Sequence, residues 1–167
     1  MRVQRFEPFL KALIPVSGGG VIREAKTFAE AGFKGAGPYG LIVSFASGGS
    51  LYANIVSSAP PGGDDHTQPE TIVEGEPPTP VPLPDLELSG GKVRTRDVEQ
   101  YLRALILNSG NPEVAAVRVL SEKDGFHKYG MNIEFHRRNV CHLYFLQTLP
   151  AGRTPQSGQD YQWLEAM

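Results

Sequence analysis

Two histidines and a glutamate in the last third of the chain have the types and spacing for metal or acid–base chemistry. Glu134, His136 and His142 fall within GMNIEFHRRNVCHLYF (130–145), where alternating apolar and polar residues predict a β-hairpin. A three-residue turn over 137–139 would place Glu134 opposite His142, with His136 diagonal to them. Two imidazoles and a carboxylate could ligate a divalent metal or transfer protons. The competing interpretation is a solvated strand face with a favourable Glu–His pair, and the sequence favours it, because a site needs all three groups to converge.

Other stretches with chemical potential are weaker. Asp64–His66 lies in a Pro/Gly loop and is interpreted as a solvated turn, since adjacent side chains rarely converge on a metal. SGGG at 17–20 lacks the Gly-Lys-Ser/Thr ending of a phosphate-binding loop and is interpreted as a connector. Cys141 is the only cysteine, which excludes an intramolecular disulfide and a multi-cysteine metal site. Its inward position in the hairpin predicts a core residue, and no motif indicates a cofactor.

The hairpin tip and the C-terminal tail carry the residues best suited to binding a partner protein. Arg137 and Arg138 at the tip could contact an acidic group, although charges in turns are usually solvated. Tyr161, Trp163 and Leu164 in the tail could dock back on the core. They could instead anchor a partner, because amphipathic aromatic residues are the usual hot spots of protein interfaces. The sequence leaves both alternatives open.

The stretch 130–153 has a counterpart at 40–63, so that Gly40 and Gly130 correspond at an offset of 90 residues. The identical pairs are Gly35/Gly125, Tyr39/Tyr129, Gly40/Gly130, Phe45/Phe135, Pro60/Pro150 and Gly62/Gly152. A three-residue turn at 47–49 gives the first copy its own hairpin. Each copy then has six apolar residues on one face: Leu41, Val43, Phe45, Leu51, Ala53 and Ile55, and Met131, Ile133, Phe135, Cys141, Leu143 and Phe145. A lone hairpin is marginally stable, so the two units are predicted to share one core.

Amphipathic helices are expected to precede the hairpins, over residues 3–14 and 96–108. Thr95 is the expected N-cap of the second helix, and Gly110 follows it as a stop signal. A strand over 113–122, apolar on both faces, is expected at the centre of the sheet.

The corresponding stretch of the first half gives conflicting signals. Val21, Ala25 and Phe28 fit one helix face, and the segment is rich in helix formers. The correspondence between the halves argues for a strand instead. We expect a helix over 21–31.

A Pro-rich, acidic segment separates the halves. Residues 57–90 hold eight of the fourteen prolines, seven acidic residues and no Lys or Arg. PPTPVPLP (77–84) favours polyproline II geometry, either as a ligand of an SH3- or WW-like groove or as a stiff connector. The missing basic residue favours the connector. The expected units are 1–63 (helix and hairpin), 64–91 (Pro-rich linker), 92–153 (helix, strand and hairpin) and 154–167 (polar tail).

Composition narrows the class of protein. The formal net charge is −2, which provides no field for a phosphate backbone, so nucleic-acid binding is not expected. The N-terminal stretch has no continuous apolar core typical of a signal peptide, and no run is long enough to span a bilayer. We expect a soluble cytoplasmic protein, or one built into a particle if it is viral.

The sequence therefore predicts an α+β protein made of a tandem pseudo-repeat. The leading hypothesis is a non-enzymatic interaction or assembly protein whose partner is a protein, self-association included. It rests on hairpins with exposable edges, the Pro-rich arm and the aromatic tail. The Gly/Pro/Ala-rich composition would fit a structural or accessory protein of a phage or mobile element. The alternative is a small metal-binding or hydrolytic domain using Glu134, His136 and His142.

Overall fold

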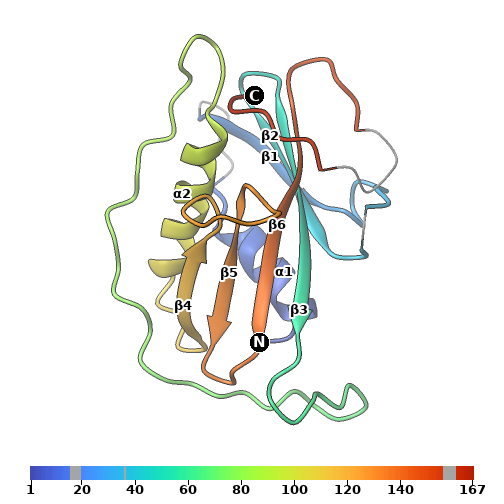
Figure 1. The fold of residues 1–167 in the computed structure, drawn as a ribbon, viewed down its shortest axis with the longest axis vertical. Helices are drawn as coiled ribbons and strands as arrows, with labels where there is room; N and C mark the ends of the chain where they lie inside the picture. Colours follow the sequence, from blue (N-terminus) through green and yellow to red (C-terminus); the bar gives the residue numbers. More distant parts are fainter. Residues whose placement is uncertain (16–19, 36, 156–160) are drawn as a thin grey trace.

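The computed structural model describes residues 1–15, 20–35, 37–155 and 161–167, which form an α+β fold of two helices and one six-stranded sheet (Figure 1). The elements are α1 (Val3–Leu13), β1 (Ile22–Thr27), β2 (Gly40–Phe45), β3 (Ser50–Ser58), α2 (Thr95–Leu107), β4 (Val114–Val119), β5 (Gly130–Phe135) and β6 (Val140–Leu149). The SGGG stretch lies, apart from Gly20, outside the described residues.

The sheet is antiparallel, with the strand order β1-β2-β3-β6-β5-β4, and it curves like half of a barrel (Figure 1). The predicted hairpins β2–β3 and β5–β6 are confirmed, and β3 pairs with β6 at the centre of the sheet. Because β1 and β4 cover β2 and β5, the expectation that hairpin edges are exposed is wrong. The expectation that the strand near 113–122 is central is also wrong, since β4 is an edge strand.

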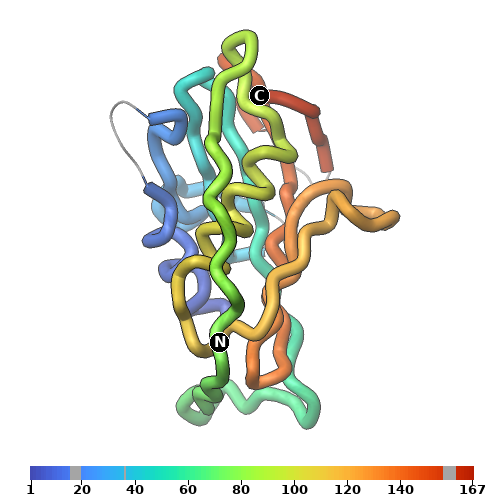
Figure 2. Tube along the Cα trace, turned by 90° about the vertical axis from the view of Figure 1, so that its left-hand side faces the viewer, coloured from blue at the N-terminus to red at the C-terminus, as the bar shows by residue number. Residues whose placement is uncertain are grey.

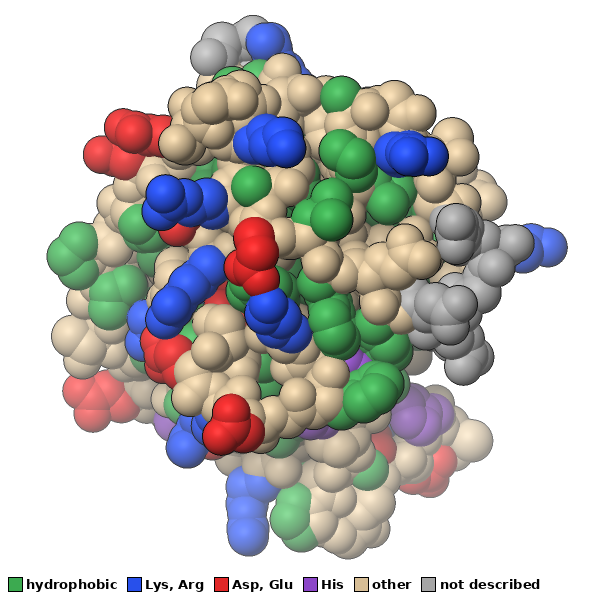
Figure 3. Space-filling view, turned by 45° about the horizontal axis from the view of Figure 1, so that its top comes forward, with side chains coloured by type: hydrophobic (Ala, Val, Ile, Leu, Met, Phe, Trp, Pro, Cys, Tyr) green, Lys and Arg blue, Asp and Glu red, His purple; other side chains and the backbone are tan. Residues whose placement is uncertain are grey.

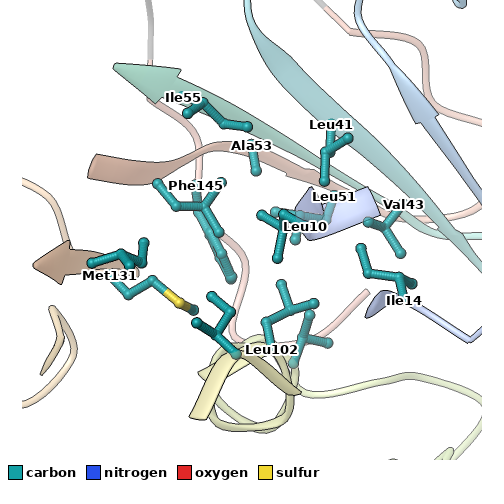
Figure 4. Packing of buried hydrophobic residues seen from close by; sticks show 14 of the residues in the cluster. Leu10, Ile14, Leu41, Val43, Leu51, Ala53, Ile55, Leu102, Met131 and Phe145 are labelled. Atoms are coloured by element: carbon teal, nitrogen blue, oxygen red, sulfur yellow. The ribbon is translucent and has the colours of Figure 1, made fainter. Parts of the chain in front are cut away.

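Both helices pack on one face of the sheet and enclose a single core. All twelve apolar hairpin residues predicted to point inward are buried. Leu10 of α1 and Leu102 of α2 pack against this face, where Phe145 of β6 and Met131 of β5 point toward them (Figure 4). The two halves share one core because neither a single hairpin nor a single helix can bury its apolar face alone.

The hairpin faces are as predicted, but the register is shifted by two residues. Val43 pairs with Leu51, not Ala53, and the three-residue loops cover 46–48 and 136–138. In each loop the third residue adopts the left-handed conformation, with φ of 80° at Gly48 and 71° at Arg138. This is the usual geometry of a three-residue hairpin loop, and it fixes which residue closes the ladder. A shift of two residues leaves every side chain on its face, so the core prediction survives the error.

The expected helix over 21–31 is wrong, because residues Ile22–Thr27 form β1. A β-bulge between Ile22 and Glu24 inserts an extra residue into the strand. The buried residues Ile22, Ala25 and Phe28 therefore recur every third position, which imitates a helical period. In β4, a bulge between Val114 and Ala116 likewise places the buried residues Val114 and Val117 three positions apart.

The two helices lie where the sequence predicted, but the start of α2 differs in detail. Thr95 is the first helical residue and not the N-cap, which is Arg94. The hydroxyl of Thr95 donates to the backbone oxygen of Leu164, and the backbone N–H of Thr95 donates to the backbone oxygen of Glu165. Contact with the tail thus replaces side-chain capping. Neither of these helices has the length and apolar character needed to cross a membrane.

Residues 71–88, called the arm below, contain no helix or strand and run along the outside of α2 (Figure 2). The Val81 N–H donates to the side chain of Asn108, whose amide donates back to the Val81 oxygen, both at 2.8 Å. The Gly75 N–H donates to Pro112 at 2.9 Å, and Val81 and Leu86 pack against the core. The arm therefore lies on its own chain.

Candidate interaction surface

The structure does not bring Glu134, His136 and His142 together. The expected pairing of Glu134 with His142 is wrong, because the shifted register pairs Glu134 with Val140. Glu134 forms an ion pair with Arg118 at 2.9 Å, and His136 lies in the hairpin loop with Nε2 3.0 Å from the oxygen of Glu76. Among the residues that the structure describes, no three His, Cys, Asp or Glu side chains are grouped to hold a metal ion.

The hairpin-tip arginines have different environments. Arg137 turns inward and binds both oxygens of Asp64, at 2.7 and 3.0 Å. Arg2 donates hydrogen bonds to the same two carboxylate oxygens, at 2.8 and 3.0 Å. Hydrogen bonds from Arg2 and Arg137 hold the pKa of Asp64 far below its usual range. Arg138 is exposed.

Asp64 is thus an anchor that joins the segment after β3 to α1 and to the β5–β6 loop. Its side chain is 8% exposed and that of Arg137 is 12% exposed. The interpretation of Asp64–His66 as a solvated turn is wrong at Asp64. Sequence distance explains the error, since Arg137 lies 73 positions away along the chain.

The tail docks on the chain's own core. Gln162 forms a parallel bridge with Gln147, and the Trp163 indole N–H donates to the backbone oxygen of Phe145 at 2.5 Å. Met167 is buried and exchanges two backbone hydrogen bonds with Val93. Residues 156–160 of the predicted tail unit lie outside the described residues.

A loop between β4 and β5, residues 120–129, crosses the sheet face opposite the helices (Figures 1 and 2). Both ends of this loop are held by one buried carboxylate, Glu99 of α2. Glu99 Oε1 accepts the Gly130 N–H at 2.7 Å and the Ser121 N–H at 3.3 Å, while Oε2 accepts the Ser121 hydroxyl. Burial raises the pKa of Glu99, and these donors oppose that effect. The loop is therefore fixed at its base and projects from the sheet.

The loop, β6 and the tail together form a cluster of rings, called the aromatic surface below: Phe126, His127, Tyr144, Tyr161 and Trp163. His127 stacks on Tyr144 with ring centroids 3.9 Å apart, and Tyr161 meets His127 edge-on at 4.6 Å. Trp163 lies 5.6 Å from Tyr161. Phe126 touches both His127 and Tyr161 edge-on, yet it is 77% exposed. Offset and edge-on arrangements are the favourable ones for aromatic rings, so the cluster is a preformed apolar platform.

A pocket of about 210 Å³ opens beside this platform. Its lining includes Lys123, Phe126, His127, Asn132, His142 and Tyr144. The ring of His142 stacks beside Tyr144, and its Nδ1 lies 2.8 Å from the Asn132 side-chain oxygen. The volume is on the scale of one large side chain, and the platform is suited to a ring or an apolar group of a partner.

Of the residues that the sequence proposed for binding, Tyr161 and Trp163 join the aromatic surface, and Leu164, the next residue of the tail, is 40% exposed. Asn132, His142 and Tyr144 share the outer strand face as expected. Sequence reasoning missed Phe126 and His127. The available signal was a single large apolar residue inside the polar run EKDGFHK (122–128).

The burial of His127 and His142 predicts that the stability of the protein depends on pH. Burial lowers the pKa of His127, with His142 lowering it further, and burial lowers the pKa of His142. The unfolded chain, with histidine near its ordinary pKa of about 6.5, then binds more protons than the folded chain as the pH falls. The stability that depends on these neutral histidines should be fully present above that pKa and should decline as the pH falls through it.

We expect the free energy of unfolding, measured with urea at pH 7.5 and pH 5.5, to be lower at the acidic pH. His127→Phe keeps the stacked ring but cannot titrate, so it should reduce this difference. His66→Phe, on an exposed turn, should not reduce it. An unchanged pH dependence in His127→Phe would show that the His127 ring does not contribute.

Comparisons of the chain with protein-family models, with curated proteins and with solved structures found no match.

Proposed function

We propose that this chain is a non-enzymatic protein-interaction or assembly protein that binds another protein chain through its aromatic surface. One observation carries the proposal: Phe126 is 77% exposed although the rings of His127 and Tyr161 contact it edge-on and Tyr144 stacks on His127. A large aromatic side chain left in water on a fixed platform is typical of an interface hot spot.

The fold does not require this exposure, as the first half demonstrates. There the loop between β1 and β2 also carries an aromatic residue, Phe33. Its ring packs 4.8 Å from Phe28 and 4.9 Å from Tyr52, and it is partly buried. The same type of loop can therefore cover its aromatic ring, so the exposure of Phe126 is a property of the second loop itself.

The sheet edges are poorer candidates for contact with a partner. Both edge strands contain a bulge, and β1 presents the Glu24–Lys26 ion pair while β4 presents Arg118. Bulges and charges are the devices that keep strand edges from pairing with other chains. Association through the face of the sheet is therefore favoured over strand addition.

We further propose that the two halves are a tandem pseudo-repeat joined by the Pro-rich segment. Matched contacts support this: Glu7 of α1 accepts the Gly40 N–H at 2.8 Å, as Glu99 of α2 accepts that of Gly130. The element order α-β-β-β also occurs in both halves. On this view the aromatic surface is a feature added to one copy of a shared framework.

The test is self-association, because a second copy of the chain is the partner most readily supplied. Light scattering after size exclusion should find the wild type associating with rising concentration and Phe126→Ser remaining monomeric. Replacing an exposed ring should leave the free energy of unfolding unchanged within about 0.5 kcal/mol. Ile72→Ser, which alters another exposed apolar residue (54%), is the control and should associate like the wild type. Identical behaviour of wild type and Phe126→Ser at every concentration would contradict self-association through this surface.

A further inference from the structure

The arm is anchored to its own molecule along only one side. Pro78, Val81 and Pro84 are partly buried, whereas the residues between them are exposed. A period of three is that of the polyproline II helix, which has three residues per turn. The two hydrogen bonds between Val81 and Asn108 fix this inward side.

The residues one position before these, Pro77, Pro80 and Leu83, form a second row, which is an outward apolar ridge. Both prolines are exposed, and Leu83 is 48% exposed. Because the inward side is already held, this ridge has little conformational entropy left to lose on binding. An exposed, preformed polyproline ridge is the form in which Pro-rich ligands enter aromatic-lined grooves.

We propose that the ridge Pro77–Pro80–Leu83 of one copy docks on the aromatic surface of a second copy. This inference rests on the proposed function and names the occupant of that surface. The rings of Phe126 and Tyr161 supply the aromatic walls, and the pocket of about 210 Å³ beside Phe126 receives a proline or the leucine. A proline ring packs favourably on an aromatic face, and the docked prolines have no N–H that needs a partner.

The occupant must come from another copy, because the arm and the aromatic surface of one molecule lie apart. The arm follows the outside of α2, whereas the loop 120–129 projects from the sheet face (Figure 2). The contacts of Gly75 with Pro112 and of Val81 with Asn108 hold the arm in that position.

Charge also favours this occupant. The segment 57–90 carries seven acidic residues and no Lys or Arg, while residues 91–167 carry ten basic and eight acidic residues. Lys123 and Asp124 both line the pocket and are exposed. Basic and acidic side chains both lie among apolar ones on the face shown in Figure 3. Asp85 and Glu87, which follow the ridge, belong to this acidic segment and would approach the half of the chain in which basic residues outnumber acidic ones.

The experiment uses a synthetic peptide of residues 74–88 titrated into the full-length protein at a concentration where the protein is monomeric. Trp163 is the only tryptophan and lies in the aromatic surface, so its fluorescence reports occupancy. We expect a saturable change with the wild type and binding weaker by about tenfold or more for Phe126→Ser. Peptides with Pro80→Ala or Leu83→Ala should also bind more weakly, whereas Thr79→Ala, on another ridge, should not.

Three results would overturn the proposal. They are the absence of binding, equal binding by Phe126→Ser, and tighter binding of a peptide with Asp85→Lys and Glu87→Lys. If the peptide fails while self-association still depends on Phe126, the aromatic surface binds another segment and the proposed function stands. If both fail, the proposed function fails with the inference.

Discussion

Replacing Gly130 with alanine is expected to destabilise the protein by about 3–5 kcal/mol, enough to unfold a domain of ordinary stability. A Cβ at this position would lie 2.2 Å from the backbone oxygen of Leu143, on the neighbouring strand β6. The φ angle of Gly130 is 136°, a backbone conformation that residues with a side chain rarely adopt. The backbone of β5 or β6 would have to move, and the Glu99 contact would move with it.

Gly110→Ala is the matched control for this prediction. Gly110 also has a positive φ of 65°, but nothing lies within 4 Å of its added Cβ. Gly110→Ala should lower the free energy of unfolding only by the conformational penalty, about 1–2 kcal/mol. Chemical denaturation followed by circular dichroism measures both variants. Similar losses in the two would refute the close approach of Gly130 to β6.

Replacing Glu99 with alanine is expected to cost about 2–5 kcal/mol. The change leaves the N–H groups of Gly130 and Ser121, and the Ser121 hydroxyl, without their acceptor, at about 1–3 kcal/mol for each buried group. It also releases both ends of the loop that carries Phe126, so self-association should weaken beyond what the loss of stability explains.

Glu7→Ala tests whether that second effect is specific. Glu7 makes the equivalent bond to Gly40 in the first half, with one N–H donor and a partly exposed side chain. We expect a loss of about 1 kcal/mol and no change in association once folding is complete. Equal weakening of association by the two variants would mean that general loosening, and not the loop, controls the contact.

Side-chain periodicity was sufficient to predict the core but not the geometry of the turns. Alternation correctly assigned twelve inward apolar residues of the two hairpins, because a slip of one residue would turn the apolar face to water. The register depended on which of Gly48 and Gly49 takes the left-handed position, and glycine suits either. The bulge in β1 changed a period of two into three, and only knowledge of its partner strand could have resolved that ambiguity.

The candidate site was less predictable, because long-range contacts assemble it. The positions of Tyr161 and Trp163 depend on the tail returning to β6, and the position of Phe126 depends on a carboxylate of α2. The triad of Glu134, His136 and His142 was proposed from strand spacing alone. Its members separated once the register moved by two residues and Arg118 of the neighbouring strand was free to pair with Glu134.

The most direct test of the account is a dilution series of amide NMR spectra, which identifies the residues at the contact without mutation. From dilute to concentrated protein, we expect the largest shifts at Phe126, His127, Tyr161 and the Trp163 indole N–H. Smaller shifts are expected at Leu83 and its neighbours in the arm. Shifts confined to β1 or β4 would place the contact at a sheet edge and contradict the account.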